Sequence, residues 1–318
     1  MIQGKQVLIT GGGGFIGSHL CERLAPNNRL VIYDNGHRNA IKYTRLLEAP
    51  NVTLIRADIL DEVRLCQAME GCQIVIHLAA IAGIDTVIKK PITTMRVNLL
   101  GTKNVLDAAV QTGNVTRLVD FSTSEVYGPY VYRADENGLT SQGPVGESRW
   151  AYAVSKLAAE HLAHCYYEEY GLPVVTVRPF NIYGPRQVGE GAIHRFIVAA
   201  LRGEALTIYA DGNQIRAWCY IDDFVNGVLL ALEKEEAIGQ VFNIGDPKQT
   251  TSILGLAEHI VRLTDKGASI QFRESTMPDV QVRVPDIRKA RELLGYEPTT
   301  SLEEGLVRTI AWYREDRG

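Results

Sequence analysis

The chain lacks any long apolar run: no stretch reaches the roughly 18 residues that a membrane-spanning helix needs. It also lacks an excess of one charge, because 33 Lys and Arg residues stand against 37 Asp and Glu residues, for a formal net charge of −4. We therefore expect neither a membrane nor nucleic acid to be its main partner. The first residues, MIQGKQVLITGGGG, lack the pattern of an export signal, so a cytoplasmic enzyme is the expectation.

Cysteine is scarce and irregularly spaced, with five residues at positions 21, 66, 72, 165 and 219. The number is odd, and Cys66 and Cys72 have no second Cys or His pair that would complete a zinc site. We expect five reduced, mostly buried thiols and no metal. The chain also has no internal repeat, low-complexity tract or linker.

Short apolar runs rich in β-branched residues alternate with helix-length segments in the first half of the chain. The runs cover residues 6–10, 30–34, 52–58, 73–80, 117–123 and 174–179. The clearest helical segments between them are 16–24, 91–112 and 150–170. Because most runs are continuously apolar, both faces of each strand should be buried. This pattern predicts an α/β fold with a doubly wound, Rossmann-like parallel sheet.

A glycine-rich turn, TGGGGFIGSHL, follows the first predicted strand and opens a helix. It places Gly11, Gly14 and Gly17 three residues apart, so that backbone amides and the helix N-terminus can approach a pyrophosphate. The next predicted strand ends in Asp34, 17 residues past Gly17. A carboxylate there accepts hydrogen bonds from both ribose hydroxyls of NAD and repels the 2′-phosphate of NADP. The turn therefore predicts an NAD site.

The pattern loosens after residue 179, where RPFNIYGPRQVGEGAIHRF indicates a long functional loop. Beyond it we expect helices at 192–202 and 222–233, two short strands around the turn at residues 211–212, and a strand in QVFNIGD. Two helices should close the chain, the last capped by Ser301. We expect an NAD-binding domain of residues 1–179 plus about 216–245. A smaller, interleaved substrate domain would take about 180–215 and 246–318.

Tyr152 and Lys156 lie four residues apart on one face of a predicted helix, within WAYAVSKLAAEH. An ammonium group beside a phenol favours the phenolate and lowers the pKa of the tyrosine toward working pH. Such a pair is common by chance on solvated faces. Here it follows an NAD turn, and it comes some 30 residues after a strand that ends in Ser122 and Thr123. That context favours a catalytic pair.

These motifs, together with NLLGT, RPFNIYGP and PDIRKARELLGYEP, make the whole chain resemble a known family. It is similar to extended short-chain dehydrogenase/reductases of the NAD-dependent epimerase/dehydratase family, which act on nucleotide sugars. The resemblance implies that Thr123 bonds the sugar 4-hydroxyl, that Tyr152 takes its proton while C4 gives a hydride to NAD, and that Lys156 holds the ribose. It also implies tightly bound NAD and a homodimer formed through the two long helices.

The glycine turn and the resemblance together imply a set of cofactor-binding residues. They are Gly11, Gly14, Phe15, Ile16, Gly17, Asp34, Asp58, Ile59, Leu78, Ala79, Ala80, Asn98, Tyr152 and Lys156.

Three branches of one mechanism, all through a 4-keto sugar, remain open within this family. A 4-epimerase needs only the threonine, tyrosine and lysine. A 4,6-dehydratase adds an acid and a base, often Asp-Glu after the threonine. A decarboxylase uses the 4-keto group as an electron sink, so that the C6 carboxylate leaves as carbon dioxide. Here Ser124 and Glu125 follow Thr123.

Glu125 disfavours a plain epimerase, and Ser124 departs from the Asp of the common dehydratases. The Thr-Ser-Glu sequence, RWAYAVSK, and NQIRAWCYIDD with Arg216 are similar to UDP-glucuronate decarboxylases. UDP-glucuronate decarboxylation is therefore the preferred reaction. The alternatives are a 4-epimerase acting on UDP-glucose or UDP-glucuronate and a 4,6-dehydratase. A non-catalytic NAD-binding sensor on the same fold is a remote alternative.

The catalytic residues that we predict are Thr123, Glu125, Tyr152 and Lys156. The predicted substrate-binding residues are Ser124, Asn181, Arg186, Arg216 and Arg283. The resemblance implies that Arg216 meets the diphosphate or the reacting sugar, and a guanidinium group suits either role. Plainer interpretations exist: Glu125 could cap a turn, Asn181 a loop, and Arg283 could form a surface ion pair. His77 is at least as well explained as a satisfied core histidine. Residues 129–146 match no family motif and are long enough to line the sugar pocket.

Overall fold

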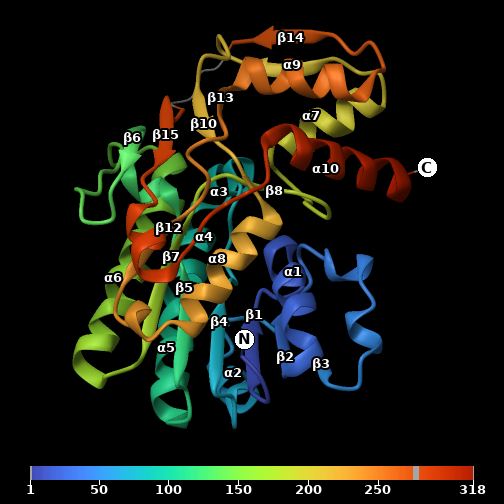
Figure 1. Ribbon diagram of the computed structural model, residues 1–318. Helices are drawn as coiled ribbons and strands as arrows, with labels where there is room; N and C mark the ends of the chain where they lie inside the picture. Colours follow the sequence, from blue (N-terminus) through green and yellow to red (C-terminus); the bar gives the residue numbers. More distant parts are fainter. Residues whose placement is uncertain (1, 275–278, 318) are drawn as a thin grey trace.

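A parallel seven-stranded sheet forms the centre of the computed structural model, which describes residues 2–274 and 279–317 (Figure 1). Its strands are β1 (Gln6–Thr10), β2 (Arg29–Asp34), β3 (Val52–Arg56), β4 (Ile74–His77), β5 (Arg117–Phe121), β7 (Val174–Pro179) and β12 (Val241–Ile244). Their order across the sheet is β12-β7-β5-β4-β1-β2-β3. The chain therefore reverses direction of travel between β1 and β4, which opens a crevice at the carboxyl edge. The predicted doubly wound fold is confirmed.

Alternate residues of each central strand enter two separate hydrophobic cores. Val7 and Ile9 of β1 pack into one core, while Leu8 between them packs into the other. The first core includes Leu20 and Phe224, which come from the helices on one face of the sheet. Those helices are α1 (Phe15–Leu24) and α8 (Ile221–Glu233), and the opposite face is covered by α2 (Glu62–Met69), α5 (Gly101–Thr112) and α6 (Ala151–Tyr170). Burial on both faces explains why the strands are continuously apolar in sequence.

The single helix predicted at 91–112 is helical throughout but not uniform. It consists of α4 (Pro91–Met95), a π-helical segment (Arg96–Leu100) and α5, and it follows the short α3 (Ile84–Lys89). A π segment inside a helix often marks a functional position. Here it contains Asn98, which a pattern of apolar residues could not distinguish from an ordinary helical residue.

The remaining elements assemble above the carboxyl edge of the large sheet, at the top of Figure 1. A four-stranded sheet has the order β13-β10-β15-β6, and two pairs, β11-β8 and β14-β9, complete the β-structure of the described residues. Their bounds are β6 (Tyr130–Ala134), β8 (Ile182–Tyr183), β9 (Leu206–Tyr209), β10 (Ile215–Ala217), β11 (Cys219–Tyr220), β13 (Thr250–Ser252), β14 (Ile270–Arg273) and β15 (Val282–Pro285). The helices here are α7 (Ala192–Leu201), α9 (Ile253–Thr264) and α10 (Leu302–Arg317), while a π segment (Ala290–Leu294) packs lower down, against α8 and β12.

The two strands predicted around residues 211–212 exist as β9 and β10, but they pair with different partners. β9 pairs with β14, and β10 lies between β13 and β15. The cap predicted for the last helix is confirmed, because the Ser301 hydroxyl accepts from the Glu304 amide at 3.2 Å. The division into an NAD-binding domain and a smaller substrate domain remains a prediction.

The five cysteines are free thiols, and three of them are buried. Within residues 2–274 and 279–317, no helix has both the length and the apolar character needed to cross a membrane.

Candidate active site

The glycine turn brings the start of α1 close to the end of β4. Gly11 has φ +70°, and a Cβ on it would lie 2.7 Å from the backbone nitrogen of Ala79. A Cβ on Gly17 would lie 2.5 Å from the Gly11 carbonyl oxygen. Only glycine permits both approaches, and the result leaves the N-terminus of α1 facing the crevice. That arrangement suits a pyrophosphate, as predicted from the spacing.

Asp34 ends β2 beside this turn. Its carboxylate accepts from the Gly13 amide at 2.9 Å and from the Gly36 amide at 2.7 Å. A Cβ on Gly13 would approach the same carboxylate to 3.0 Å, so the loop and the acid fit closely. Asp34 also lines the crevice, where it is placed to meet ribose hydroxyls. The residues present therefore fit NAD.

A cleft of about 570 Å³ follows the carboxyl edge from Asp34 to Tyr152 and Lys156. The predicted cofactor residues that line it are Gly11, Gly14, Phe15, Ile16, Gly17, Asp34, Asp58, Ile59, Leu78, Ala79, Ala80, Tyr152 and Lys156. Sequence reasoning did not name several other lining residues, among them Arg38, Lys90 and Glu190. They come from loops whose position at the cleft depends on the fold.

Asn98 is the one predicted cofactor residue that does not line the cleft. It is buried in the π segment, where its side chain accepts from the Ile81 amide at 2.8 Å and donates to the Ile81 carbonyl and the Ser155 hydroxyl. Ser155 in turn donates to the Tyr152 carbonyl at 2.7 Å. Asn98 thus joins the loop after β4 to the start of α6, and it supports the site from behind.

Thr123, Tyr152 and Lys156 meet at the inner end of the cleft. Tyr152 and Lys156 lie one turn apart on α6, and the Thr123 and Tyr152 side chains form a hydrogen bond. Burial raises the pKa of Tyr152 to about 12, and the nearby Glu125 carboxylate adds to the rise. The hydrogen bond from Thr123 and the charge of Arg283 oppose it. Tyr152 is therefore protonated near neutral pH, and additional positive charge is needed to make it a base.

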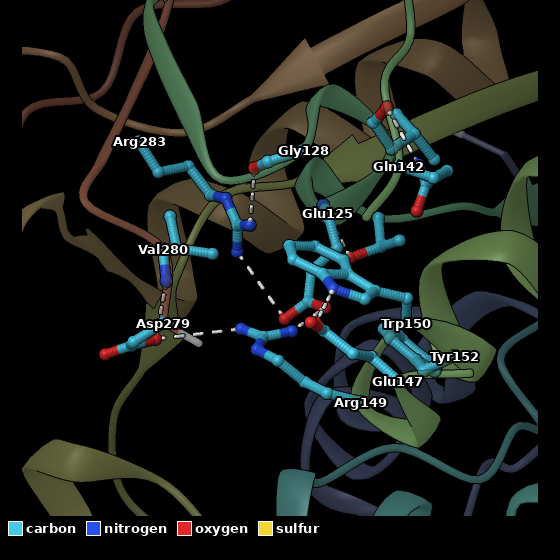
Figure 2. Close-up of polar contacts among 12 residues, drawn as sticks. Glu125, Gly128, Gln142, Glu147, Arg149, Trp150, Tyr152, Asp279, Val280 and Arg283 are labelled. Atoms are coloured by element: carbon cyan, nitrogen blue, oxygen red, sulfur yellow. Dashed lines mark hydrogen bonds and ion pairs between the residues drawn. The ribbon is translucent and has the colours of Figure 1, made fainter. Parts of the chain in front are cut away.

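Glu125 lies beside this group, held between two buried arginines (Figure 2). Its carboxylate is 3.1 Å from Arg149 Nη1 and 3.5 Å from Arg283 Nη1. Burial alone would raise the pKa of Glu125, but the Arg283 and Arg149 guanidinium groups outweigh it and hold the pKa below its usual range. Arg283 also donates to the Gly128 carbonyl at 3.3 Å. The cap of this turn is Thr123, whose hydroxyl accepts from the Glu125 amide at 3.2 Å, and the Glu125 carboxylate pairs with the two arginines instead.

Asp279 connects a third arginine to the same cluster. Its Oδ1 atom lies 3.7 Å from Arg149 Nη2 and 3.4 Å from Arg216 Nη2. Burial lowers the pKa of Arg216 to about 10. Among the described residues, the three buried guanidinium groups of this arginine cluster, those of Arg149, Arg216 and Arg283, pair with the carboxylates of Glu125 and Asp279. Guanidinium groups gathered in this way suit an anionic ligand.

The cluster contains residues that the sequence did not assign. The sequence indicates Arg149 only as part of RWAYAVSK, and no local pattern indicates a role for Asp279. Of the predicted substrate residues, Arg216 and Arg283 lie in the cluster, and Ser124 is buried in the turn beside it.

Asn181 and Arg186 have partners outside the group formed by Arg149, Arg216 and Arg283. Asn181, at φ +44°, donates from its side chain to the Ala217 carbonyl at 2.9 Å. Arg186, at φ +65°, turns toward α1, where its guanidinium is 2.5 Å from the Glu22 carboxylate and 3.3 Å from His19 Nε2. Arg186 is therefore not part of the arginine cluster, and its role toward substrate stays a prediction.

His77 has the environment of a core residue. Its ring nitrogens lie 2.7 Å from the Thr10 hydroxyl and 3.0 Å from the Thr102 hydroxyl. Burial, together with the charge of Lys156, lowers the pKa of His77 to about 3, so it is neutral at working pH. No group of three or more potential metal ligands occurs in the part of the chain that the structure describes.

Comparisons with known proteins identify the family of the chain and its relatives. Residues 7–245 match the model of the NAD dependent epimerase/dehydratase family. The chain is 38% identical to a UDP-N-acetyl-alpha-D-glucosaminuronate decarboxylase of Bacillus cytotoxicus over 98% of both proteins. It is 37% identical to UDP-glucuronic acid decarboxylase 1 of Xenopus tropicalis, over 98% of this chain and 73% of that protein.

A solved structure is also similar over nearly the full length. It is the UDP-glucuronic acid 4-epimerase from Bacillus cereus in complex with UDP-glucuronic acid and NAD. It is 35% identical, with a TM-score of 0.89, and the match covers 98% of this chain and 99% of that one.

Proposed function

Because the chain belongs to the NAD-dependent epimerase/dehydratase family, whose members include nucleotide-sugar enzymes, we propose that it decarboxylates a UDP-linked uronic acid, in the first instance UDP-glucuronate. The observation that carries the proposal is Glu125, held between Arg149 and Arg283 directly after Thr123. The two curated relatives described above, both named as decarboxylases of UDP-uronates, support it.

The first step is oxidation at C4 of the sugar. Tyr152 accepts the proton of the 4-hydroxyl, Thr123 bonds the same oxygen, and Lys156 binds the ribose and favours the tyrosine phenolate. NAD held at the glycine turn and Asp34 would supply the acceptor for the C4 hydride and the donor that restores it. These residues stand together at the inner end of the cleft, which is the arrangement that the step requires.

Loss of carbon dioxide follows from the C4 ketone, which makes the C6 carboxylate part of a β-keto acid. The C5–C6 bond breaks, its electron pair forms an enolate with O4, and carbon dioxide leaves. A proton then adds at C5, a hydride returns to C4, and Tyr152 returns its proton to O4. The arginine cluster offers cations for both the diphosphate and the sugar carboxylate. When the substrate competes for Arg149 and Arg283, Glu125 is released to exchange a proton at C5.

The second candidate is 4-epimerisation of UDP-glucuronate. It is favoured by the 35% identity to the epimerase solved with that sugar nucleotide. An epimerase would use the same C4 oxidation and the same arginine cluster but would retain the carboxylate. A 4,6-dehydratase is a weaker alternative, because Ser124 stands where those enzymes commonly have Asp.

Product analysis separates these reactions. The purified protein is incubated with UDP-glucuronate and, in parallel, with UDP-N-acetylglucosaminuronate, and carbon dioxide and the nucleotide product are measured. We expect carbon dioxide and a nucleotide of a five-carbon sugar. Recovery of UDP-galacturonate alone would refute decarboxylation in favour of epimerisation. If wild type and Tyr152→Phe behave alike, with no turnover and no reduction of bound NAD, the chain is a sensor rather than an enzyme.

We also propose that the protein is a cytoplasmic homodimer. Ile92 of α4, Leu100 of the π segment and Val154 of α6 expose apolar side chains on the helices through which the family is expected to pair. Exposed apolar side chains on helices that contact one another suit an interface with a second copy of the chain. Sedimentation of the wild type and of Ile92→Glu tests the association, and a monomeric wild type would contradict it.

A further inference from the structure

Asp120 is a fully buried carboxylic acid directly beneath the catalytic turn. It lies on β5, two residues before Ser122, and is 0% exposed. Neither of its carboxylate oxygens has a hydrogen-bond partner in the described structure. A buried acid without partners is costly to keep, so its presence needs a reason.

The strands on either side place polar residues at the same level as Asp120. His77 of β4 is its neighbour in register on one side, and Thr176 of β7 is its neighbour on the other. Both are buried, and Asp120 is the acid between them. The row belongs to the face of the sheet that α5 and α6 cover.

Two charged residues of α6, the helix that covers this face of the sheet, change the pKa of Asp120 through their charges. Lys156 and Glu160, one helical turn apart, both influence its ionisation electrostatically. Glu160 already has a partner, because Arg178 of β7 donates to it through Nε at 3.1 Å and through Nη2. Lys156 makes no ion pair among residues 2–274 and 279–317, although it is almost completely buried. Among the described residues, Asp120 is therefore the buried acid without an arginine partner that lies within the electrostatic reach of Lys156.

The other groups packed around Asp120 do not supply charge at working pH. His77 is neutral because burial lowers its pKa to about 3. From α5, Thr102 contacts His77 beside Asp120, and its hydroxyl does not titrate. Burial raises the pKa of Asp120, while the Lys156 ammonium opposes that rise.

We propose that Asp120 is a positioning residue that balances the Lys156 ammonium and so sets the pH at which Tyr152 becomes a base. The inference rests on the proposed roles of Tyr152 and Lys156. An ionised Asp120 cancels part of the field with which Lys156 stabilises the tyrosine phenolate. Removal of that charge leaves the field of Lys156 undiminished, so the pKa of Tyr152 falls.

The test is a titration of Tyr152 in the purified holoenzyme. The ultraviolet absorbance of tyrosinate is followed against pH, and the same protein with Tyr152→Phe is subtracted so that one residue is observed. The measurement is made in wild type, Asp120→Asn and Asp120→Leu, with Thr176→Val as an uncharged control at the neighbouring register position. The acid limb of the kcat/KM profile is recorded for each protein that retains Tyr152.

We expect both Asp120 variants to lower the midpoint of the Tyr152 titration by about one pH unit, as removal of one nearby buried charge implies. The acid limb of kcat/KM should move the same way, and Thr176→Val should move neither. An unchanged midpoint in Asp120→Asn, or an equal shift in Thr176→Val, overturns the proposal. A shift in Asp120→Asn that is absent in Asp120→Leu does so too, because both lack the charge.

One further outcome distinguishes this inference from the proposed function. If subtraction of the Tyr152→Phe protein reveals no titrating tyrosine, Tyr152 is not the base, and both ideas fail. If Tyr152 titrates and the enzyme turns over but Asp120 has no effect, only the role of Asp120 is refuted.

Discussion

Replacement of Gly11 by alanine should weaken both the fold and the retention of NAD. Gly11 has φ +70°, a conformation that costs an L-residue about 1–2 kcal/mol. The added Cβ would also lie 2.7 Å from the nitrogen and 2.9 Å from the Cα of Ala79. These are backbone atoms that cannot rotate away, and overpacking of this kind adds about 1–3 kcal/mol. The free energy of unfolding should therefore fall by about 2–5 kcal/mol.

The matched control is Gly4→Ala. Gly4 has a similar φ of +65°, but a Cβ there would meet nothing within 4 Å. It should lose only the backbone contribution of about 1–2 kcal/mol. Urea unfolding gives the stability of both variants, and the NAD that stays with the protein after gel filtration reports on the cleft. If both variants lose the same stability and retain equal NAD, the contact with Ala79 has no energetic importance and the reasoning is wrong.

Three further predictions concern the charged interior. Glu160→Gln should lower the free energy of unfolding by about 3–5 kcal/mol, because it leaves the Arg178 guanidinium buried without its anion. Addition of Arg178→Met to the same chain should recover much of this loss. A loss below about 1 kcal/mol in urea unfolding would contradict the prediction. The pKa of His77 is about 3 in the folded chain against 6.5 in the unfolded chain, so acid favours unfolding, in which His77 takes up a proton. Its contribution to the free energy of unfolding is complete above pH 6.5, and about 2–3 kcal/mol of it is lost as the pH falls to 4.5. His77→Gln should flatten that slope, and an unchanged slope would count against a neutral buried His77. Glu125→Gln should lower kcat for carbon dioxide release by about 10²-fold or more, while oxidation at C4 of the sugar, with Tyr152 as the base, should still reduce bound NAD. Full activity would exclude Glu125 as the acid/base.

The sequence predicted the parts of the fold that depend on local pattern. Apolar runs of the right length became the strands of the large sheet, and the glycine spacing identified the turn that now contacts Ala79. The pairing of β9 and β10 with other strands was not predictable, because the Asp211–Gly212 turn between them looks like a hairpin and only long-range contacts decide otherwise.

The site was predictable where chemistry lies close together along the chain. Tyr152 and Lys156 share one helix turn, so their spacing predicts their meeting. Asp279 and Arg149 are 130 residues apart along the chain, and no local pattern relates them. Asp120 could not be predicted as part of the site, because a single acid in an apolar run does not indicate which charged side chains will pack against it.

The late position of β15 in the chain has a consequence for synthesis on the ribosome. In the four-stranded sheet, β6 pairs with β15, whose residues follow it by about 150 positions. A nascent chain that has emerged as far as β12 already contains the glycine turn, Tyr152 and Lys156, and all seven strands of the large sheet. It still lacks Asp279 and Arg283, so the arginine cluster is incomplete. The growing chain thus acquires the means to hold its cofactor before it acquires the means to hold a sugar nucleotide.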